Sequence, residues 1–442
     1  MPVWIAVIWR HPSQMGLASA PRTGGLRVGY LTGVYPRATD TFIQREVASL
    51  RDRGVEVRTF AIRRPDASQL IGREQQQEMS NTTYVVAAGA VGATFGVMRA
   101  FAASPRSAWR AARLAGRTHV LGWRGAMKQG AYLAEACIVA RELRRRRVQH
   151  LHNHFPDSSG TVAMLAAELA GITFSFTMHG AEILRDVDKW RLDEKVKRAL
   201  FVVSVSWYGR SQAMLVSPAS SWPRIHVVHC GVDLRASSVR AHHADGRHLA
   251  FVGRLDDVKG VPLLLDAVSL VRRAYPDVHL TLVGDGPSRS SLEASAQSAG
   301  LQSHVSFVGY RAPVDVRLLL ATVDVFVLPS FFEGIPVSLM EAMACGVPVV
   351  ASNLPGIAEL VDDAVNGYLV RAGDSEELAE RIAGLLASAE LRNRMGRAGR
   401  AKVADQFDLE QETDRLETLM VSSLGGRAVA VRPPVRESAN AV

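Results

Sequence analysis

Cysteine is scarce in this sequence: Cys137, Cys230 and Cys345 are the only three in 442 residues. Their number is odd, they lie far apart, and no C-x-x-C pair occurs. Disulfide-stapled domains and zinc knuckles depend on closely spaced cysteines, so neither is indicated here. A reducing cytoplasm is therefore the expected compartment.

Long hydrophobic runs are also lacking. The longest uncharged stretch, roughly residues 81–98, contains three glycines and many small residues. It is borderline in length and weak in hydrophobicity for a spanning helix, which needs about 20 apolar residues, so no transmembrane helix is predicted. The N-terminal apolar segment has no positive region ahead of it and is interrupted by Arg10 and His11, unlike a signal peptide. We expect residues 1–25 to form a flexible extension.

Acidic residues are outnumbered, with 43 Asp and Glu against 52 Lys and Arg and a net charge of +9. This excess suggests attraction to nucleotide diphosphates, to nucleic acid or to an anionic membrane surface. Arginines between residues 99 and 124 are interleaved with Phe101, Trp109 and Trp123, as in an interfacial segment. Solvated helix faces covering a sheet would give the same pattern, and the sequence leaves both interpretations open.

What the chain does contain is an alternation of apolar strands with helical segments. A strand at 26–33, a helix at 41–53 and a strand at 55–62 make a βαβ unit, which predicts a parallel, doubly wound sheet. A chain of this length exceeds what one core usually serves, and the hydrophobic pattern is lost over 231–247, so two domains joined there are predicted. The other expected strands are 148–152, 174–178, 200–204, 249–252, 280–283, 305–308, 325–328, 347–351 and 368–370.

The most informative segment is 324–350, DVFVLPSFFEGIPVSLMEAMACGVPVV. A buried strand is followed by a loop that carries Glu333 and by a helix that carries Glu341 early in its length and ends at Gly346. Free backbone N–H groups and the positive end of a helix dipole attract an anion, so this turn suits phosphate held beside hydroxyl groups. Taken singly, Glu333 could be a solvated loop residue and Glu341 a favourable charge near a helix start.

The surrounding pattern, E-G-x-P-x-x-x-x-E-A-M-A-x-G-x-P-V-V-A-S, resembles the donor-site signature of glycosyltransferase family 4. FVGRLDDVKG, with Arg254 and Lys259, the turn VGDGP and the strand VSFVGY resemble other landmarks of that family, in the same order. The resemblance extends from about residue 26 to about residue 420. It implies an α/β, GT-B architecture, in which two Rossmann-like doubly wound parallel-sheet domains face each other across a cleft.

The resemblance also implies a division of labour between the domains. Residues 26–230 would bind the acceptor and residues 248–407 the nucleotide sugar, with a helix at 408–420 crossing back to the first domain and a disordered tail at 425–442. Arg254 and Lys259 would clamp the donor diphosphate, since a guanidinium and an ammonium suit an anion that gains charge as it leaves. The implied donor site comprises Gly253, Arg254, Lys259, Gly284, Tyr310, Glu333, Gly334, Ile335, Pro336 and Glu341, with Glu341 on the ribose and Glu333 on the sugar.

Histidines form a second feature. His150, His152 and His154 alternate in VQHLHNHF, so they share one face of a strand-to-loop segment and could ligate zinc. No carboxylate or cysteine at a convincing spacing completes the set, so a metal site is not favoured, and the segment resembles the H-x-H region of family 4. His179 follows another strand and matches the family's cleft histidine, so His179 and Glu333 are the predicted catalytic residues.

The first strand-to-helix loop, TGVYPRATDTFIQREV, should reach the acceptor. It resembles a subset of family 4 that builds exopolysaccharide, the colanic-acid type among them. Asp40 also suits an N-cap, and both roles can hold. The predicted acceptor-binding residues are Thr39, Asp40, Thr41, Arg45 and His154.

Two other signatures are discounted. Asp186-Val187-Asp188 is a D-x-D, as in metal-dependent GT-A enzymes, but it lies in a charged segment rather than at a strand end. Gly284-Asp285-Gly286 has no third glycine at the dinucleotide-binding offset, which argues against a dehydrogenase. The resemblance implies a metal-independent enzyme without a cofactor, whose co-substrate is the nucleotide sugar.

We therefore expect a retaining transferase that moves a hexose from a UDP- or GDP-sugar to a lipid-linked saccharide, cytoplasmic and peripheral at an anionic membrane, with no nucleic-acid partner. Two alternatives stay open: a nucleotide-sugar 2-epimerase of the same fold, and a non-catalytic binder of nucleotide sugars or polysaccharide. The sequence does not distinguish UDP from GDP or identify the sugar and the linkage.

Overall fold

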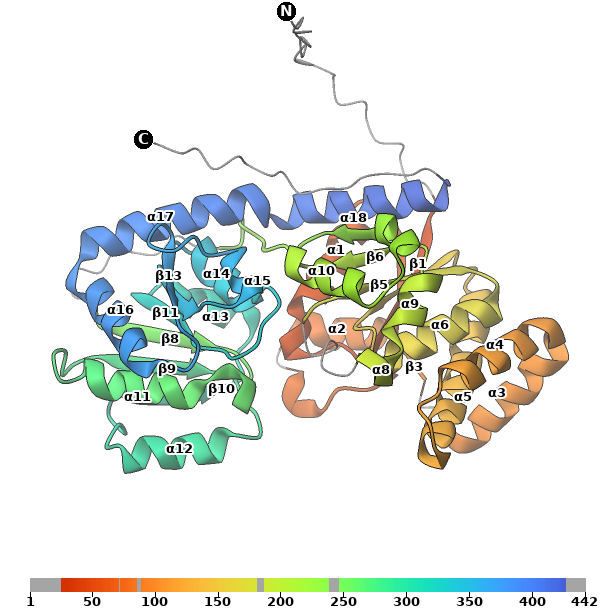
Figure 1. Ribbon diagram of the computed structural model, residues 1–442, viewed down its shortest axis with the longest axis horizontal. Coiled ribbons are helices and arrows are strands. Elements are labelled where there is room, and N and C mark those ends of the chain that lie inside the picture. The colour runs from red at the N-terminus through yellow and green to blue at the C-terminus, as the bar shows by residue number, and fades with distance from the viewer. Residues whose placement is uncertain (1–24, 71, 86–88, 181–186, 238–245, 427–442) are drawn as a thin grey trace, which may run out of the picture.

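The computed structural model describes residues 25–70, 72–85, 89–180, 187–237 and 246–426. The predicted extension, apart from Gly25, and nearly all of the predicted tail lie outside these ranges, as do residues 238–245 of the predicted linker. Within them the chain forms two parallel sheets of seven and six strands, each covered by helices (Figure 1). The predicted fold class, two Rossmann-like parallel-sheet domains, is confirmed.

The first sheet has the strand order β3-β2-β1-β4-β5-β6-β7. Its central strands are buried on both faces, as expected for a parallel sheet between two layers of helices. The strands are β1 Arg27–Val34, β2 Glu56–Arg63, β3 Thr83–Tyr84, β4 His150–His154, β5 Thr173–Met178, β6 Val202–Ser204 and β7 Ile225–Val227. The sequence did not predict β3 and β7, which are edge strands of two and three residues and too short to show a period.

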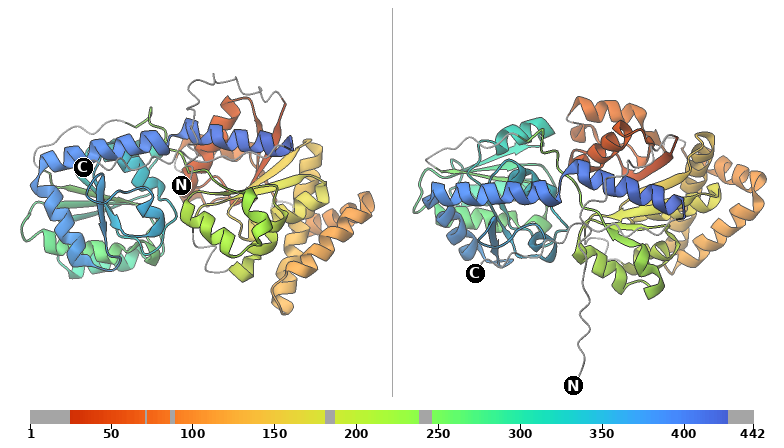
Figure 2. Two further views of the ribbon diagram at one scale, coloured as in Figure 1. Left: turned by 45° about the horizontal axis from the view of Figure 1, so that its top comes forward. Right: turned by 90° about the horizontal axis from the view of Figure 1, so that it is seen from above.

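The helices of the first half are α1 Thr41–Asp52, α2 Arg73–Asn81, α3 Gly89–Ala103, α4 Pro105–Thr118, α5 Trp123–Arg145, α6 Ser158–Ala170, α8 Val187–Trp190, α9 Leu192–Arg198 and α10 Trp207–Leu215. Helices α3, α4 and α5 extend away from the second half at one end of the molecule (Figures 1 and 2). Among the residues that the structure describes, no helix combines the length and the apolar character needed to span a bilayer.

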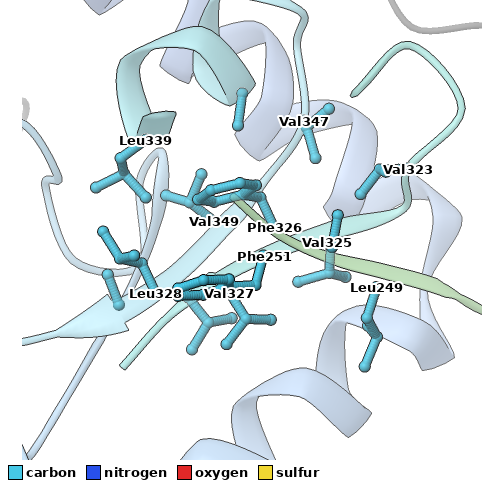
Figure 3. Packing of buried hydrophobic residues seen from close by; sticks show 14 of the residues in the cluster. Leu249, Phe251, Val323, Val325, Phe326, Val327, Leu328, Leu339, Val347 and Val349 are labelled. Carbon is cyan, nitrogen blue, oxygen red and sulfur yellow. The ribbon is translucent and has the colours of Figure 1, made fainter. Parts of the chain in front are cut away.

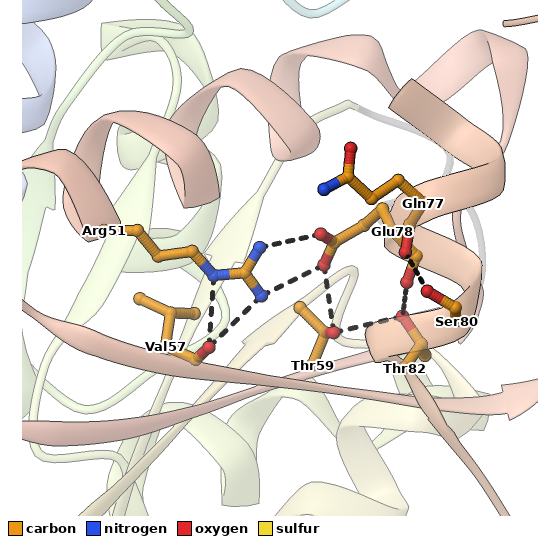
Figure 4. Close-up of polar contacts among 7 residues, drawn as sticks. All are labelled: Arg51, Val57, Thr59, Gln77, Glu78, Ser80 and Thr82. Atoms are coloured by element: carbon orange, nitrogen blue, oxygen red, sulfur yellow. Dashed lines mark hydrogen bonds and ion pairs between the residues drawn. The ribbon is translucent and has the colours of Figure 1, made fainter. Parts of the chain in front are cut away.

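A polar cluster fastens α2 to the edge of the first sheet (Figure 4). Glu78 on α2 accepts from Arg51 Nη1 on α1 at 2.7 Å and from Thr59 Oγ1 on β2 at 3.0 Å. Thr82, just before β3, shares a 3.0 Å hydrogen bond with Thr59. These contacts fix the position from which the two-residue strand β3 joins β2.

The second sheet has the strand order β10-β9-β8-β11-β12-β13. Its strands are β8 His248–Val252, β9 His279–Val283, β10 Val305–Gly309, β11 Val325–Leu328, β12 Val349–Ser352 and β13 Gly367–Val370. Phe251, Phe326 and Leu328 pack with valines of neighbouring strands in a core of almost entirely apolar side chains (Figure 3). Each of these strands lies within two residues of its predicted position.

The second half is covered by α11 Val261–Val271, α12 Arg289–Ser298, α13 Pro313–Leu320, α14 Val337–Ala344, α15 Pro355–Ala358, α16 Ser375–Ala387 and α17 Ala389–Gln406. The chain then returns through α18 Leu409–Leu424, whose Leu416, Leu419 and Met420 pack into the core of the first half. Helices α17 and α18 together run along one side of both halves (Figures 1 and 2). The predicted crossing helix is therefore present.

Candidate active site

The carboxyl ends of the two sheets face a cavity of about 560 Å³, which both halves line. All predicted catalytic and donor-site residues border it, and so do four of the five predicted acceptor residues. The exception is His154, which is fully buried. Parallel α/β sheets form ligand sites at this edge, so the location agrees with the topology.

Lys259 and Glu333, both in the second half, form an ion pair that lines the cavity. Lys259 ends the short 3-10 helix Asp257–Lys259 after β8, and its Nζ lies 2.6 Å from Glu333 Oε1. Ser330 donates to the same carboxylate oxygen at 2.7 Å. The two side chains predicted to hold diphosphate and sugar are thus paired with each other, and only 21% and 9% of their side-chain surfaces are exposed.

Glu341 differs from its predicted setting. Helix α14 begins at Val337, so Glu341 lies in the second turn, beyond the free N–H groups of the helix start. Its Oε1 lies 2.5 Å from Nη2 of Arg45, which belongs to α1 in the other half. The structure therefore joins a predicted donor residue to a predicted acceptor residue by an ion pair across the cleft.

Among the described residues, four ion pairs border the cavity. Besides the two above, Arg37 Nε lies 2.6 Å from Asp40 and Arg254 Nε lies 2.5 Å from Asp256. Asp40 is the N-cap residue of α1, but its side chain forms no capping hydrogen bond and engages Arg37 and Thr39 instead. The cations of these pairs are positioned to bind a diphosphate in the cavity. The carboxylates that hold them could accept hydrogen bonds from sugar hydroxyls.

Gly334 lies where the two halves are in close contact. A Cβ atom at this position would lie 2.3 Å from the backbone oxygen of His179, a distance that real side chains do not tolerate. The loop after β11 therefore needs glycine where it touches the end of β5. Gly284 plays a similar part within the second half, since its φ is +132° and a Cβ there would lie 1.9 Å from the oxygen of Gly253.

His179 lies at the cavity wall with both ring nitrogens engaged. Nε2 lies 2.6 Å from Nδ1 of His154, and Nδ1 lies 3.4 Å from Sγ of Cys230. Burial, with a smaller contribution from His154, lowers the pKa of His179 well below its usual value, so the ring is neutral. His154 supports His179 from behind and does not itself reach the cavity.

The argument against a metal site needs one correction. The sequence offered no carboxylate near the histidines, but α1 brings Glu46 Oε1 to 3.4 Å from Nε2 of His154, and Glu46, His152 and His154 form a group of possible metal ligands. Sequence spacing could not reveal a contact between residues so far apart. Other bonds already occupy this group: Tyr30 donates to Glu46 at 2.7 Å, and both nitrogens of His152 bind Ser175 and Thr177.

Tyr310 borders the cavity beside the loop after β9, and its hydroxyl donates to the oxygen of Asp285 at 3.2 Å. Burial, followed by the nearby Asp285 charge, raises the pKa of Tyr310, so the phenol is neutral. A neutral aromatic ring at this wall is suited to border a nucleoside base.

Sequence reasoning missed Asp157 and Trp190, which also line the cavity. Asp157 caps α6, accepting from the Ser159 N–H at 2.8 Å, and Lys195 donates to its backbone oxygen at 2.7 Å. Burial lowers the pKa of Lys195 to about 7. The position of Asp157 directly after a buried strand was a usable signal, whereas nothing in the sequence singled out Trp190.

Comparisons with known proteins agree with this geometry. Residues 236–402 match the family model of glycosyl transferases group 1. D-inositol 3-phosphate glycosyltransferase of Segniliparus rotundus is 30% identical to this chain over 322 residues, which cover 67% of the chain and 71% of that protein. The putative colanic acid biosynthesis glycosyltransferase WcaL of Escherichia coli K12 is 26% identical over 419 residues, covering 89% of the chain and 99% of that protein.

Among solved structures, HepE of Anabaena in complex with UDP and glucose superposes with a TM-score of 0.68. The alignment covers 90% of this chain and 100% of HepE at 18% sequence identity. At that identity the likeness concerns the fold, and it supports the GT-B architecture.

Proposed function

This chain belongs to the group 1 glycosyltransferases and is an enzyme that transfers a sugar, and we propose that its donor is a hexose carried on UDP or GDP and its acceptor a hydroxyl group of a lipid-linked saccharide. The product would be an exopolysaccharide or another glycan of the cell envelope. The reaction would take place at the inner face of the cell membrane.

The observation that carries this proposal is the convergence of charged pairs on one cavity. Lys259, Arg254 and Glu333 come from the loops of the second sheet, while Arg45 and His179 come from the first half. A nucleotide sugar offers a partner to both kinds of group: phosphate oxygens to the cations and hydroxyl groups to the carboxylates. A binder that only held a polysaccharide would not need cations paired with acids along its cavity.

We propose that transfer proceeds with retention, on one face of the sugar. The bond from the anomeric carbon to the diphosphate breaks, the acceptor oxygen bonds to the same face, and the acceptor proton passes to the departing diphosphate oxygen. Arg254 and Lys259 stabilise the charge that develops there without a divalent cation. Two cavity carboxylates, Glu333 and Glu341, are each paired with a cation, which suits hydroxyl binding better than nucleophilic attack.

Relatives support the assignment to exopolysaccharide synthesis. WcaL, named for colanic acid biosynthesis, aligns over nearly its whole length, and AmsK of Erwinia amylovora, named for amylovoran biosynthesis, aligns over 96% of its own. Both products are exopolysaccharides. An acceptor of the same type would be a growing saccharide on a lipid carrier.

The first test is ligand-induced thermal stabilisation of the purified protein by UDP, GDP, ADP and their common sugars, with and without EDTA. A ligand that binds only the folded state raises apparent stability by mass action. We expect one uridine or guanosine series to shift the transition, equally in EDTA. A shift that disappears in EDTA would contradict metal independence, and no shift from any nucleotide would contradict the donor site.

Product analysis then separates transfer from its alternatives. With the stabilising nucleotide sugar and a membrane extract as acceptor source, we expect labelled sugar to move into the lipid fraction with its anomeric configuration kept. Release of a free sugar epimerised at C2 would indicate the epimerase. Binding without turnover in the presence of acceptor would indicate a non-catalytic binder.

A further inference from the structure

Exposed apolar side chains are concentrated in one part of the described structure. Seven of the fourteen large hydrophobic residues that are exposed there lie between residues 98 and 127. The remaining seven are spread between residues 207 and 365. Isolated surface hydrophobics are ordinary, whereas a contiguous group marks a surface that contacts something.

The group centres on the turn between α4 and α5. Leu121 in this turn is 90% exposed, Trp123 at the start of α5 is 69% exposed, and Met127 one turn later is 66% exposed. Val120 is also exposed. We call residues 117–128 the α4–α5 tip. Nothing in the described chain covers Leu121, the most exposed of all these side chains.

Charge of one sign surrounds this tip. Between Glu78 and Glu135 the sequence has no acidic residue, but it has six arginines and one lysine. Arg117, Arg124 and Lys128 are exposed on the tip itself, and the guanidinium of Arg124 lies 5.3 Å from the Trp123 ring centre.

Helix α4 continues the same composition. Its buried face consists of Ala108, Ala111, Leu114, Ala115 and Thr118. Its exposed face carries Arg106, Trp109, Arg110 and Arg113, at spacings of three and four residues that place them on one side of the helix. Trp109 is 67% exposed. Tryptophan and arginine are residues that reside where apolar surface meets water.

We propose that the α4–α5 tip, with the exposed face of α4, docks this enzyme on an anionic lipid bilayer. Trp123, Leu121 and Met127 would enter the interface between headgroups and acyl chains, while the surrounding cations bind lipid phosphates. The partner is a bilayer because highly exposed apolar side chains stand on the tip among charges that are all positive within residues 117–128; on α4, Arg110 is paired with Glu168. A second protein would more often meet a flatter patch with charges of both signs at its rim.

The α4–α5 tip contacts a residue that adjoins the lining of the cavity. Arg191 Nη1 donates to the backbone oxygen of Arg117 at 2.9 Å, and the preceding residue, Trp190, lines the cavity. If the proposed function is correct, a lipid-linked acceptor would have a short path from the bilayer to the transfer site. The docking surface itself is argued from its own residues and does not depend on that reaction.

The test is flotation of the full-length protein with vesicles of phosphatidylcholine, alone or mixed with phosphatidylglycerol. We expect the wild type to float with the mixed vesicles, to stay unbound with pure phosphatidylcholine, and to lose binding at high salt because ions screen the cations. Binding to neither kind of vesicle, or equally to both, would overturn the proposal.

Two double variants then locate the surface. L121S/W123S should weaken binding at least about tenfold by removing the inserted side chains, and R124E/K128E should do so through charge reversal. Matched controls are L215S/V365S, which remove other exposed apolar side chains, and R394E/R397E, which reverse two exposed charges on α17. Unchanged flotation of both tip variants, or equal loss in the controls, would also overturn the proposal.

Two further measurements distinguish membrane docking from self-association and from a wrong donor assignment. Sedimentation velocity tests whether the tip joins two copies of the chain: a dimer that L121S/W123S converts to monomer without affecting flotation would assign the surface to self-association. Nucleotide-induced thermal shifts of the tip variants should equal those of the wild type. Loss of the shift in every protein, wild type included, would count against the proposed donor and leave the docking surface unaffected.

Discussion

In the second sheet the central strands bring almost only apolar side chains inward, from Leu249–Phe251, Val325–Leu328 and Val349–Ala351 (Figure 3). In the first sheet the corresponding strands β4 and β5 bring histidines, serine and threonine. His150 binds Thr173 and Ser175, and His152 binds Ser175 and Thr177, all at 2.7 to 2.9 Å. Two sheets of similar topology are thus stabilised at their centres by different interactions.

This difference between the two sheets affects the groups that each half presents to the cavity. Apolar packing is non-directional, and in the second half charged groups such as Lys259 and Glu333 lie beyond the ends of the strands. In the first half the polar face of the sheet continues to the cavity, where buried His154 supports His179 at the wall. Hydrogen bonds between neutral buried groups fix orientation, and each group is costly if it loses its partner. We infer that the buried histidines give the first half a neutral stretch of cavity wall around His179, beside the charged groups that both halves contribute.

The largest effect should come from the charge in the second half. Lys259→Ala should lower kcat/KM by about 10³-fold, because it removes a preorganised cation that acts on the leaving diphosphate. The unfolding midpoint in urea should hardly move, since Lys259 is partly exposed and outside the apolar core. Turnover within a few-fold of wild type would contradict the donor assignment.

A matched control is Arg273→Ala, which removes an exposed cation of the same half, away from the cavity. Its activity should equal that of the wild type. Equal losses in the two variants would indicate a general effect of charge rather than a specific contact.

The contact between the two halves gives the next largest effect. Gly334→Ala should lower kcat by about 10²-fold. The added Cβ would lie 2.3 Å from the His179 oxygen, so the loop after β11 would have to move away from His179 by a fraction of an ångström or more. Nucleotide binding, measured by calorimetry, should be reduced much less than kcat. Gly384→Ala is the control, since a Cβ there meets no atom within 4 Å.

The third prediction is that the stability of the first sheet depends more strongly on pH than that of the second sheet. Burial lowers the pKa of His150 to about 3, and burial lowers the pKa values of His152 and His179 well below 6.5. Below the unfolded value of about 6.5 the unfolded chain binds more protons than the folded one, so stability is complete above that pH and falls as the pH drops toward 3. Each histidine contributes up to about 1.4 kcal/mol per pH unit.

Hydrogen exchange at pH 7 and pH 5, corrected for the intrinsic rate, should therefore show that amides of β4 and β5 lose protection in acid. Amides of β11 and β12, strands without a titratable residue, serve as the control in the same sample and should lose less. Equal loss in both sheets would remove the distinction drawn between them. His150→Gln should reduce the pH dependence in the first half, because one titrating group is gone.

The contrast between the sheets also explains what could be predicted from sequence. Strong apolar runs predicted β8, β9 and β11 to within a residue, and the motifs pointed to residues that all border one cavity. Two kinds of feature escaped prediction. Edge strands such as β7 are held by the sheet rather than by their own pattern. Contacts such as Arg45 to Glu341, or Glu46 to His154, join residues that only the folded topology brings together.

The smallest effect should come from the ion pair across the cleft. Arg45→Ala removes the 2.5 Å contact to Glu341, and since Glu341 borders the cavity, where water can solvate it, we expect a loss of only about 1 kcal/mol in stability. A second contact, in which Glu359 of the second half accepts from the N–H groups of Trp207 and Tyr208, remains to hold the halves together.

Small-angle scattering of Arg45→Ala should therefore show a slightly larger radius of gyration than that of the wild type when no nucleotide is present. With the nucleotide sugar bound, the radius should equal the wild-type value if the donor binds Glu341. Because the pair occupies a carboxylate that the donor's ribose is proposed to use, nucleotide affinity should stay unchanged or rise a few-fold. A fall of tenfold or more would assign Arg45 to the donor itself and show that the first half also contributes charge to donor binding.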